Sequence, residues 1–276
     1  TGYTNATTVT ATIHGTLSAT PATTDWKEQA FGTLRGYPVS VAFHQDRLVF
    51  GGSKSLLNRL WLSKSGDYFN FDLGTGLDDE AIEFGILSDQ INAVRGLVSS
   101  RHLQVFCSGA EFMVTGNPLT PTNIQVSRQT HIGSPTDRAI APIDIDGATM
   151  FINRDRDEIR EFLFTDLEQA YRATDVALLT HDMIEGAVDQ DFDKARRLLC
   201  VVRGDGTFST LTLYRSENIT AWSRHTTAGA VKSCVVANNR LYLQVFRNSQ
   251  YLLEEWRDDC WTDSSVIATN ATPQTT

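Results

Sequence analysis

The chain has 276 residues, of which 41% are hydrophobic, so it can form one large all-β domain or two smaller ones with a sizeable core. Its formal net charge of -9 argues against a protein that wraps nucleic acid, because phosphate contacts need clustered Lys and Arg. The same acidic balance suits a passage that repels DNA and does not hold it. No apolar run approaches the ~20 residues of a membrane helix, and residues 1–6 do not resemble a signal peptide, so we expect no membrane insertion.

The two ends of the chain differ in composition from its middle. Apolar residues from Val9 to Ile13 alternate with Thr, which predicts one or two exposed strands or an edge hairpin. The chain has no initiator Met and its last residues read as a linker, so we expect it to be a segment of a longer protein. The predicted organisation is Thr-rich strands and a linker at 1–24, a β-propeller domain at 25–262, and a C-terminal linker to a missing region at 263–276.

The stretch Val39–Phe71 contains three short apolar runs in which every second residue is hydrophobic, as with Val41 and Phe43. Period two is typical of β-strands, because successive side chains leave opposite faces. His44–Arg47 and Gly51–Ser53 supply turn residues between the runs. This stretch is therefore predicted to be an up-and-down antiparallel unit.

Four further units of the same kind follow along the chain. Asp146-Gly147 is a strong hairpin signal, and Gly204–Gly206 is read as another hairpin turn. Leu167–Leu179 is the best candidate for a helix. The four units begin near Ile91, Ala139, Ile184 and Val231.

The spacing of equivalent strands identifies the architecture. One strand of each unit is anchored at Leu48, Leu103, Met150, Leu199 and Leu241, and the successive gaps are 55, 47, 49 and 42 residues. A repeat of about 40–50 residues with four short strands is expected for the blades of a β-propeller. Five blades are visible, or six if N-terminal strands complete another, and the alternative architecture is a pair of β-sandwiches.

The four cysteines do not have the spacing of a zinc cluster, because none forms a CxxC pair. Cys107, Cys200 and Cys234 lie in apolar runs, which favours buried free thiols. A disulfide between Cys234 and Cys260 remains an open alternative.

Four stretches of the chain carry recognisable structural motifs, namely Phe43–Gly52, Ser63–Phe71, Pro118–Asn123 and Trp222–Thr227. In these motifs and in their order the chain resembles tail nozzle proteins, also described as tail tubular protein B-like, of short-tailed bacteriophages and related prophages. The resemblance extends from about Asp25 to Trp256.

The resemblance implies a structural, non-enzymatic virion protein whose propeller forms part of the conduit for DNA ejection. Its expected partners are other copies of itself in a ring, expected to be a hexamer, and neighbouring tail or adaptor proteins. Genomic DNA would pass transiently without specific binding. The expected location is the phage tail, after assembly in the bacterial cytoplasm. Family members are generally longer, with further β-domains, so ring assembly by this segment alone is not expected.

Aromatic residues and abundant carboxylates motivate an alternative function, a propeller at the tail tip that binds or cleaves host glycans. Cleavage needs two carboxylates placed across one glycosidic bond, and no spacing in the sequence identifies such a pair. A general scaffold that docks other tail proteins is a third hypothesis. Trp61, Trp222 and Trp256 fall late in their units, which favours packing between blades over a sugar platform.

No catalytic residue, cofactor or metal ligand is predicted. His44 and His102 follow comparable turns but lack an HxH or HExxH arrangement, so we interpret them as turn or surface histidines. Asp78–Glu80 lacks the spacing of a calcium loop and is interpreted as a solvated acidic turn. Ser63–Asp67 resembles the turn motif of sialidase propellers but departs from its spacing, and is interpreted as a turn between strands of one blade.

Overall fold

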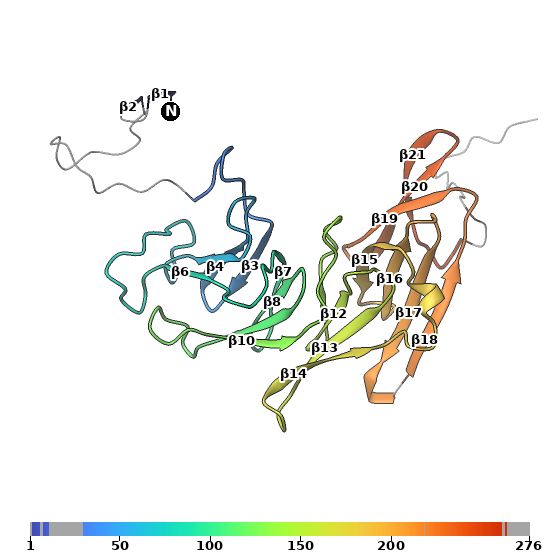
Figure 1. Ribbon diagram of the computed structural model, residues 1–276. Coiled ribbons are helices and arrows are strands. Elements are labelled where there is room, and N and C mark those ends of the chain that lie inside the picture. The colour runs from blue at the N-terminus through green and yellow to red at the C-terminus, as the bar shows by residue number, and fades with distance from the viewer. Residues whose placement is uncertain (1, 6–7, 11–29, 218, 261–262, 264–276) are drawn as a thin grey trace, which may run out of the picture.

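The computed structural model describes residues 2–5, 8–10, 30–217, 219–260 and 263. Between Ser40 and Glu255 its strands form five successive antiparallel sheets, each made only of strands consecutive in sequence. The sheets follow one another around an arc, with the first at the left and the fifth at the upper right in Figure 1. This arrangement is a β-propeller, as predicted, and the alternative of paired sandwiches is wrong.

The strand bounds are as follows. Blade 1 contains β3 (Ser40–His44), β4 (Arg47–Gly51), β5 (Arg59–Leu62) and β6 (Ile82–Gly85). Blade 2 contains β7 (Val94–Ser99), β8 (Leu103–Cys107), β9 (Glu111–Thr115) and β10 (Gln125–Thr130). Blade 3 contains β11 (Ile143–Ile145), β12 (Ala148–Ile152), β13 (Ile159–Thr165) and β14 (Ala170–Asp175).

Blade 4 contains β15 (Ala187–Asp193), β16 (Leu198–Arg203), β17 (Phe208–Tyr214) and β18 (Ile219–His225). Blade 5 has three strands, β19 (Ala230–Ala237), β20 (Arg240–Arg247) and β21 (Gln250–Glu255). Two short 3₁₀ helices are present among the described residues, η1 (His181–Met183) and η2 (Arg215–Glu217).

The predicted repeat is confirmed strand by strand. The five anchor positions fall in β4, β8, β12, β16 and β20, the second strand of every blade, and all are buried. The predicted turn at Asp146-Gly147 joins β11 to β12 with positive φ at both residues, as a two-residue hairpin requires. Gly204–Gly206 joins β16 to β17, also as predicted.

The predicted helix at Leu167–Leu179 is wrong. Residues 170–175 instead form β14, which pairs antiparallel with β13 along its whole length. Leu167 and Leu179, the ends of the predicted helix, are almost fully exposed and cover no core. Pairing with a neighbouring strand outweighs local helix propensity here.

The N-terminal strands form a hairpin of their own. β1 (Gly2–Asn5) pairs with β2 (Thr8–Thr10). This pair joins none of the five sheets and lies apart from them in Figure 1, so it is not a sixth blade. Most of the Val9–Ile13 stretch, for which one or two exposed strands or an edge hairpin were expected, lies outside the described residues. The remainder of the predicted 1–24 region, and the C-terminal linker except Asp263, lie outside the described residues.

The core is divided among the seams, the interfaces between consecutive blades. The described residues form four buried apolar clusters, one in each seam, and none joins blade 1 to blade 5. Each cluster contains residues of both blades that meet at its seam, such as Val49 and Leu97, Phe106 and Phe162, Ile152 and Leu199, and Val202 and Leu243. Over the residues that the structure describes, the propeller is therefore an open arc, held together by four seams in series.

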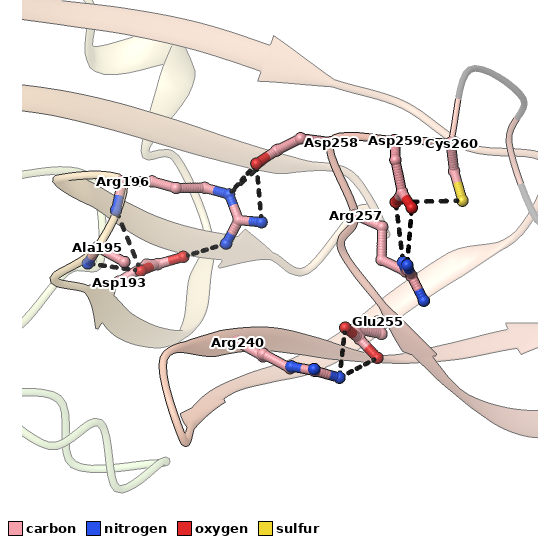
Figure 2. Close-up of polar contacts among 9 residues, drawn as sticks. All are labelled: Asp193, Ala195, Arg196, Arg240, Glu255, Arg257, Asp258, Asp259 and Cys260. Carbon is pink, nitrogen blue, oxygen red and sulfur yellow. Dashed lines mark hydrogen bonds and ion pairs between the residues drawn. The ribbon is translucent and has the colours of Figure 1, made fainter.

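The segment after β21 returns to blade 4. Arg196, in the turn between β15 and β16, contacts both Asp193 and Asp258, as Figure 2 shows. Nearby, Cys260 is a free thiol, so the alternative of a Cys234–Cys260 disulfide is wrong. The other three cysteines are buried and unpaired, which confirms their interpretation as small apolar residues.

Candidate interaction surfaces

The first strand of blade 1 separates polar and apolar side chains onto opposite faces. The Ser40 hydroxyl accepts a hydrogen bond from the backbone N–H of Leu97 at 3.0 Å, so this face of β3 lies against blade 2. Val41 and Phe43 leave the other face and are 58% and 61% exposed. The Phe43 ring packs on the edge of Tyr68, with centroids 5.2 Å apart. We call Val39, Val41, Phe43 and Tyr68 the blade 1 end face.

Blade 5 presents a comparable surface at the opposite end of the arc. On β20, Leu243 and Val245 are buried in the seam with blade 4, so Phe246 leaves the opposite face. Phe246 pairs with Tyr251 across β20 and β21, with ring centroids 4.9 Å apart. Leu253 is 72% exposed on β21. We call Val235, Phe246, Tyr251 and Leu253 the blade 5 end face.

These residues were not identified as an interaction surface from the sequence. Val41 and Phe43 alternate in the same way as residues that are buried in seams elsewhere. Period two assigns a side chain to a face but does not say whether a neighbour covers that face. The exposure of both end faces becomes apparent only once the arc is seen to be open.

The acidic segment beside the blade 1 end face is a tightly bonded turn. One carboxylate oxygen of Glu80 accepts the backbone N–H groups of Thr75, Gly76 and Leu77 at 2.6–2.8 Å. These hydrogen bonds, that from Leu77 foremost, lower the pKa of Glu80. The buried Arg47 side chain donates to the backbone carbonyls of Asp78 and Glu80. Asp78 and Asp79 are exposed, as expected for a solvated acidic turn.

The interpretation of His44 as a turn or surface residue is wrong. It ends β3 on the face toward blade 2, is buried, and lies 2.8 Å from the Ser99 hydroxyl through its Nδ1. Burial, with a smaller effect of the nearby His102, lowers the pKa of His44. His102 follows the β7–β8 turn and is half-buried against Phe164 and Tyr171. His44 follows Ser40 by four residues on β3, so both side chains leave the same face of the strand. This alternation was the sequence feature that could have placed His44 toward blade 2.

The tryptophan predictions are confirmed at two of three positions. Trp222 donates its indole N–H to the Val176 carbonyl at 3.2 Å, across the seam between blades 3 and 4. Trp256 packs on the edge of Phe208 from blade 5 onto blade 4. Trp61 is also buried, but its ring contacts Phe31 on the side of the blade 1 end face, not in a seam.

The Ser63–Asp67 stretch forms the predicted turn after β5. The Ser63 hydroxyl accepts a hydrogen bond from the backbone N–H of Leu48, and the backbones of Lys64 and Asp67 form an isolated antiparallel β-bridge. Neither contact creates a catalytic arrangement, and the Ser63 side chain is fully buried.

A cavity of about 440 Å³ lies between the outer strands of blades 1 and 2. Among the described residues that line it, Asp89 is the one carboxylate and Arg128 the one cation. A single acid does not provide the carboxylate pair that glycoside hydrolysis requires. No helix among the residues covered by the structure is long and apolar enough to cross a membrane.

Neither a family model nor a curated protein matches this sequence. Among solved structures, the chain is similar to a putative 6-phosphogluconolactonase from Bacteroides uniformis, with 13% identity, a TM-score of 0.51, and 82% of this chain and 71% of that chain covered. It is also similar to BamB from Moraxella catarrhalis, with 16% identity, a TM-score of 0.49, and 78% of this chain and 56% of that chain covered.

A third similar structure is the β-propeller domain of Cps50 (Swd1) from Myceliophteria thermophila, with 9% identity, a TM-score of 0.49, and 80% of this chain and 71% of that chain covered. The chain thus spans little more than half the length of BamB. At these identities the likeness to the lactonase bears on the fold alone. By its fold the protein belongs to the β-propeller class.

Proposed function

We propose that this protein is a structural component of a virion, the propeller domain of a phage tail nozzle that forms part of the DNA-ejection conduit. The observation that carries the proposal is the pair of apolar end faces on an open arc. Contiguous exposed apolar surface on a folded domain marks a contact with another protein. In a ring of six copies, each end face is buried against a neighbouring copy or a tail protein.

The surface charge supports the same function. The chain carries 33 Asp and Glu residues against 24 Lys and Arg, and a net charge of -9. Many of the described arginines are paired with carboxylates, such as Arg240 with Glu255 and Arg59 with Glu83. A surface of this kind holds DNA weakly, which suits a conduit through which the genome passes.

Phage particles produced by the bacterium whose genome contains this sequence provide the test of the proposal. Immunogold labelling with an antibody against residues 30–260 is expected to mark the distal end of the tail. Absence of the protein from purified particles would refute a structural virion role. Purified protein is also expected not to retain duplex DNA at physiological salt, and tight binding would contradict a conduit function.

A substitution pair tests the end face itself. Phe43→Asp places a charge on the blade 1 end face, and Leu167→Asp places the same charge on an exposed leucine in the β13–β14 turn. We expect Phe43→Asp to abolish incorporation into particles while Leu167→Asp is incorporated normally. Equal incorporation of both folded variants would mean that this face is not an assembly surface.

A further inference from the structure

Three potential metal ligands, far apart in sequence, meet beside blade 3. Glu158 precedes β13, Asp175 ends β14, and His181 begins η1 in the connection to blade 4. One donor atom from each residue lies within 4.8 Å of the others. Asp175 Oδ2 and His181 Nε2 lie 2.9 Å apart. Their spacing of 17 and 6 residues matches no linear metal motif, so this cluster could not be recognised from the sequence.

Surrounding hydrogen bonds fix the orientation of both carboxylates. The Asp175 side chain is only 6% exposed, and its Oδ1 accepts the backbone N–H of Ala177 at 2.8 Å. Arg160 donates two hydrogen bonds to Glu158 Oε2, at 2.8 and 2.5 Å. Among the described residues, Glu158 Oε1 accepts no hydrogen bond. Hydrogen bonds to one oxygen of each carboxylate therefore hold both side chains, and Asp175 Oδ2 contacts the imidazole.

The backbone around the three residues is also tied together. The N–H of Val176 bonds to the Ile159 carbonyl at 3.1 Å, which joins the end of β14 to the start of β13. The His181 carbonyl accepts the N–H groups of Ile184 and Glu185 at 2.9 and 3.0 Å. The donor atoms thus come from braced segments, so their approach costs little additional ordering on binding an ion.

We propose that Glu158, Asp175 and His181 form a binding site for a divalent transition-metal ion, represented by Zn²⁺, with a remaining position open to water. One imidazole and two carboxylates are a donor set that zinc accepts, with metal–ligand bonds of about 2.0–2.2 Å. Neighbouring ligands of a tetrahedral ion at such distances lie about 3.4 Å apart. The Asp175–His181 separation of 2.9 Å is somewhat shorter than that value, and no pair of donor atoms is more than 4.8 Å apart.

Arg160 acts as the outer partner that orients Glu158, a role that carboxylate ligands commonly require. In the site the ion replaces the direct hydrogen bond between Asp175 and His181. Once bound, it links the β12–β13 turn, the end of β14 and η1. The site therefore fastens the connection between blades 3 and 4, independently of the nozzle function proposed above.

Isothermal titration of tag-free protein with ZnCl₂ tests the proposal. We expect one Zn²⁺ per chain and a rise in the melting temperature on saturation. His181→Ala, whose side chain is 41% exposed, is expected to fold normally and to weaken zinc binding ~10-fold or more. Glu158→Gln is a second variant with the same expectation.

Asp182→Asn is the matched control. Asp182 follows His181 directly and pairs with Arg224, outside the cluster, so its loss is expected to leave zinc affinity unchanged. Absence of binding at micromolar zinc, or equal affinity of wild type, His181→Ala and Glu158→Gln, overturns the proposal. Binding of Mg²⁺ or Ca²⁺ that is as tight as that of Zn²⁺, and independent of His181, also overturns it.

Discussion

The seam between blades 4 and 5 and the blade 1 end face are built from the same kind of strand. In the seam, alternate residues of β20, including Leu243 and Val245, are buried against blade 4. On the end face, Val41 and Phe43 alternate in the same way along β3 and are largely exposed. Each Å² of apolar surface removed from water contributes about 25 cal/mol, so only the first arrangement stabilises the isolated chain.

Polar contacts add a second difference between these two regions. Asp189 and Asp191 of β15 accept the backbone N–H groups of Cys234 and Val236 of β19, at 3.0 and 2.6 Å. Burial raises the pKa of Asp189 despite these bonds. A seam thus combines apolar packing with specific hydrogen bonds between blades. The sequence pattern makes a strand face apolar, and packing of the neighbouring blade turns that face into part of the core.

Truncating an aromatic ring in a seam is expected to have the largest effect. Phe162 is fully buried between blades 2 and 3 and stacks on Tyr171, with centroids 4.5 Å apart. Phe162→Ala should lower the free energy of unfolding by about 3–5 kcal/mol, because it leaves a cavity. Phe43→Ala on the end face should change it by no more than about 0.5 kcal/mol. Urea denaturation of both variants measures the difference.

If Phe162→Ala and Phe43→Ala lower the free energy of unfolding equally, the blade 1 end face must be packed in solution. A concentration-dependent loss confined to Phe43→Ala would instead indicate self-association through that face.

Two aspartates that contact the same arginine provide a test of intermediate size (Figure 2). Asp193 is buried and accepts the backbone N–H groups of Ala195 and Arg196, whereas Asp258 is mostly exposed. Asp193→Ala should cost about 1–3 kcal/mol, since it leaves buried donors unpaired. Asp258→Ala should cost about 0–1 kcal/mol, as exposed ion pairs do. Thermal denaturation of both variants in low and high salt checks the ranking, which a larger loss for Asp258→Ala would reverse.

The smallest expected effects appear as opposite pH dependences of two glutamates. Glu111 is buried and accepts the N–H of Gly133 at 2.8 Å, and burial raises its pKa above the usual 4.5. Its contribution to stability is therefore present below pH ~4.5 and is lost as pH rises through the folded pKa. Glu80 has a lowered pKa, so its contribution is present above pH ~4.5 and is lost as pH falls.

Urea denaturation between pH 4 and 7 distinguishes the two signs. Relative to Glu111→Gln, the wild type should lose stability as pH rises, whereas relative to Glu80→Gln it should gain stability. If the stability difference from wild type changes with pH in the same direction for both variants, the pKa values of the two carboxylates are not shifted in opposite directions.

The sequence predicted the architecture through local signals. Period-two alternation located the second strand of every blade, and Asp146-Gly147 marked a hairpin that the structure contains. The same signals failed where a tertiary neighbour decided the outcome. Residues 167–179 were predicted to be a helix, yet pairing with β13 made residues 170–175 a strand. His44 followed a turn pattern, yet blade 2 buries it.

By itself, the sequence determined that this chain folds into five similar antiparallel units, because alternation and turn chemistry act between residues close together along the backbone. Only the tertiary structure decided that the arc stays open, that Val41 and Phe43 remain exposed, and that Glu158, Asp175 and His181 meet. The physical reason is that burial and ligand geometry depend on distances through space between residues far apart in sequence.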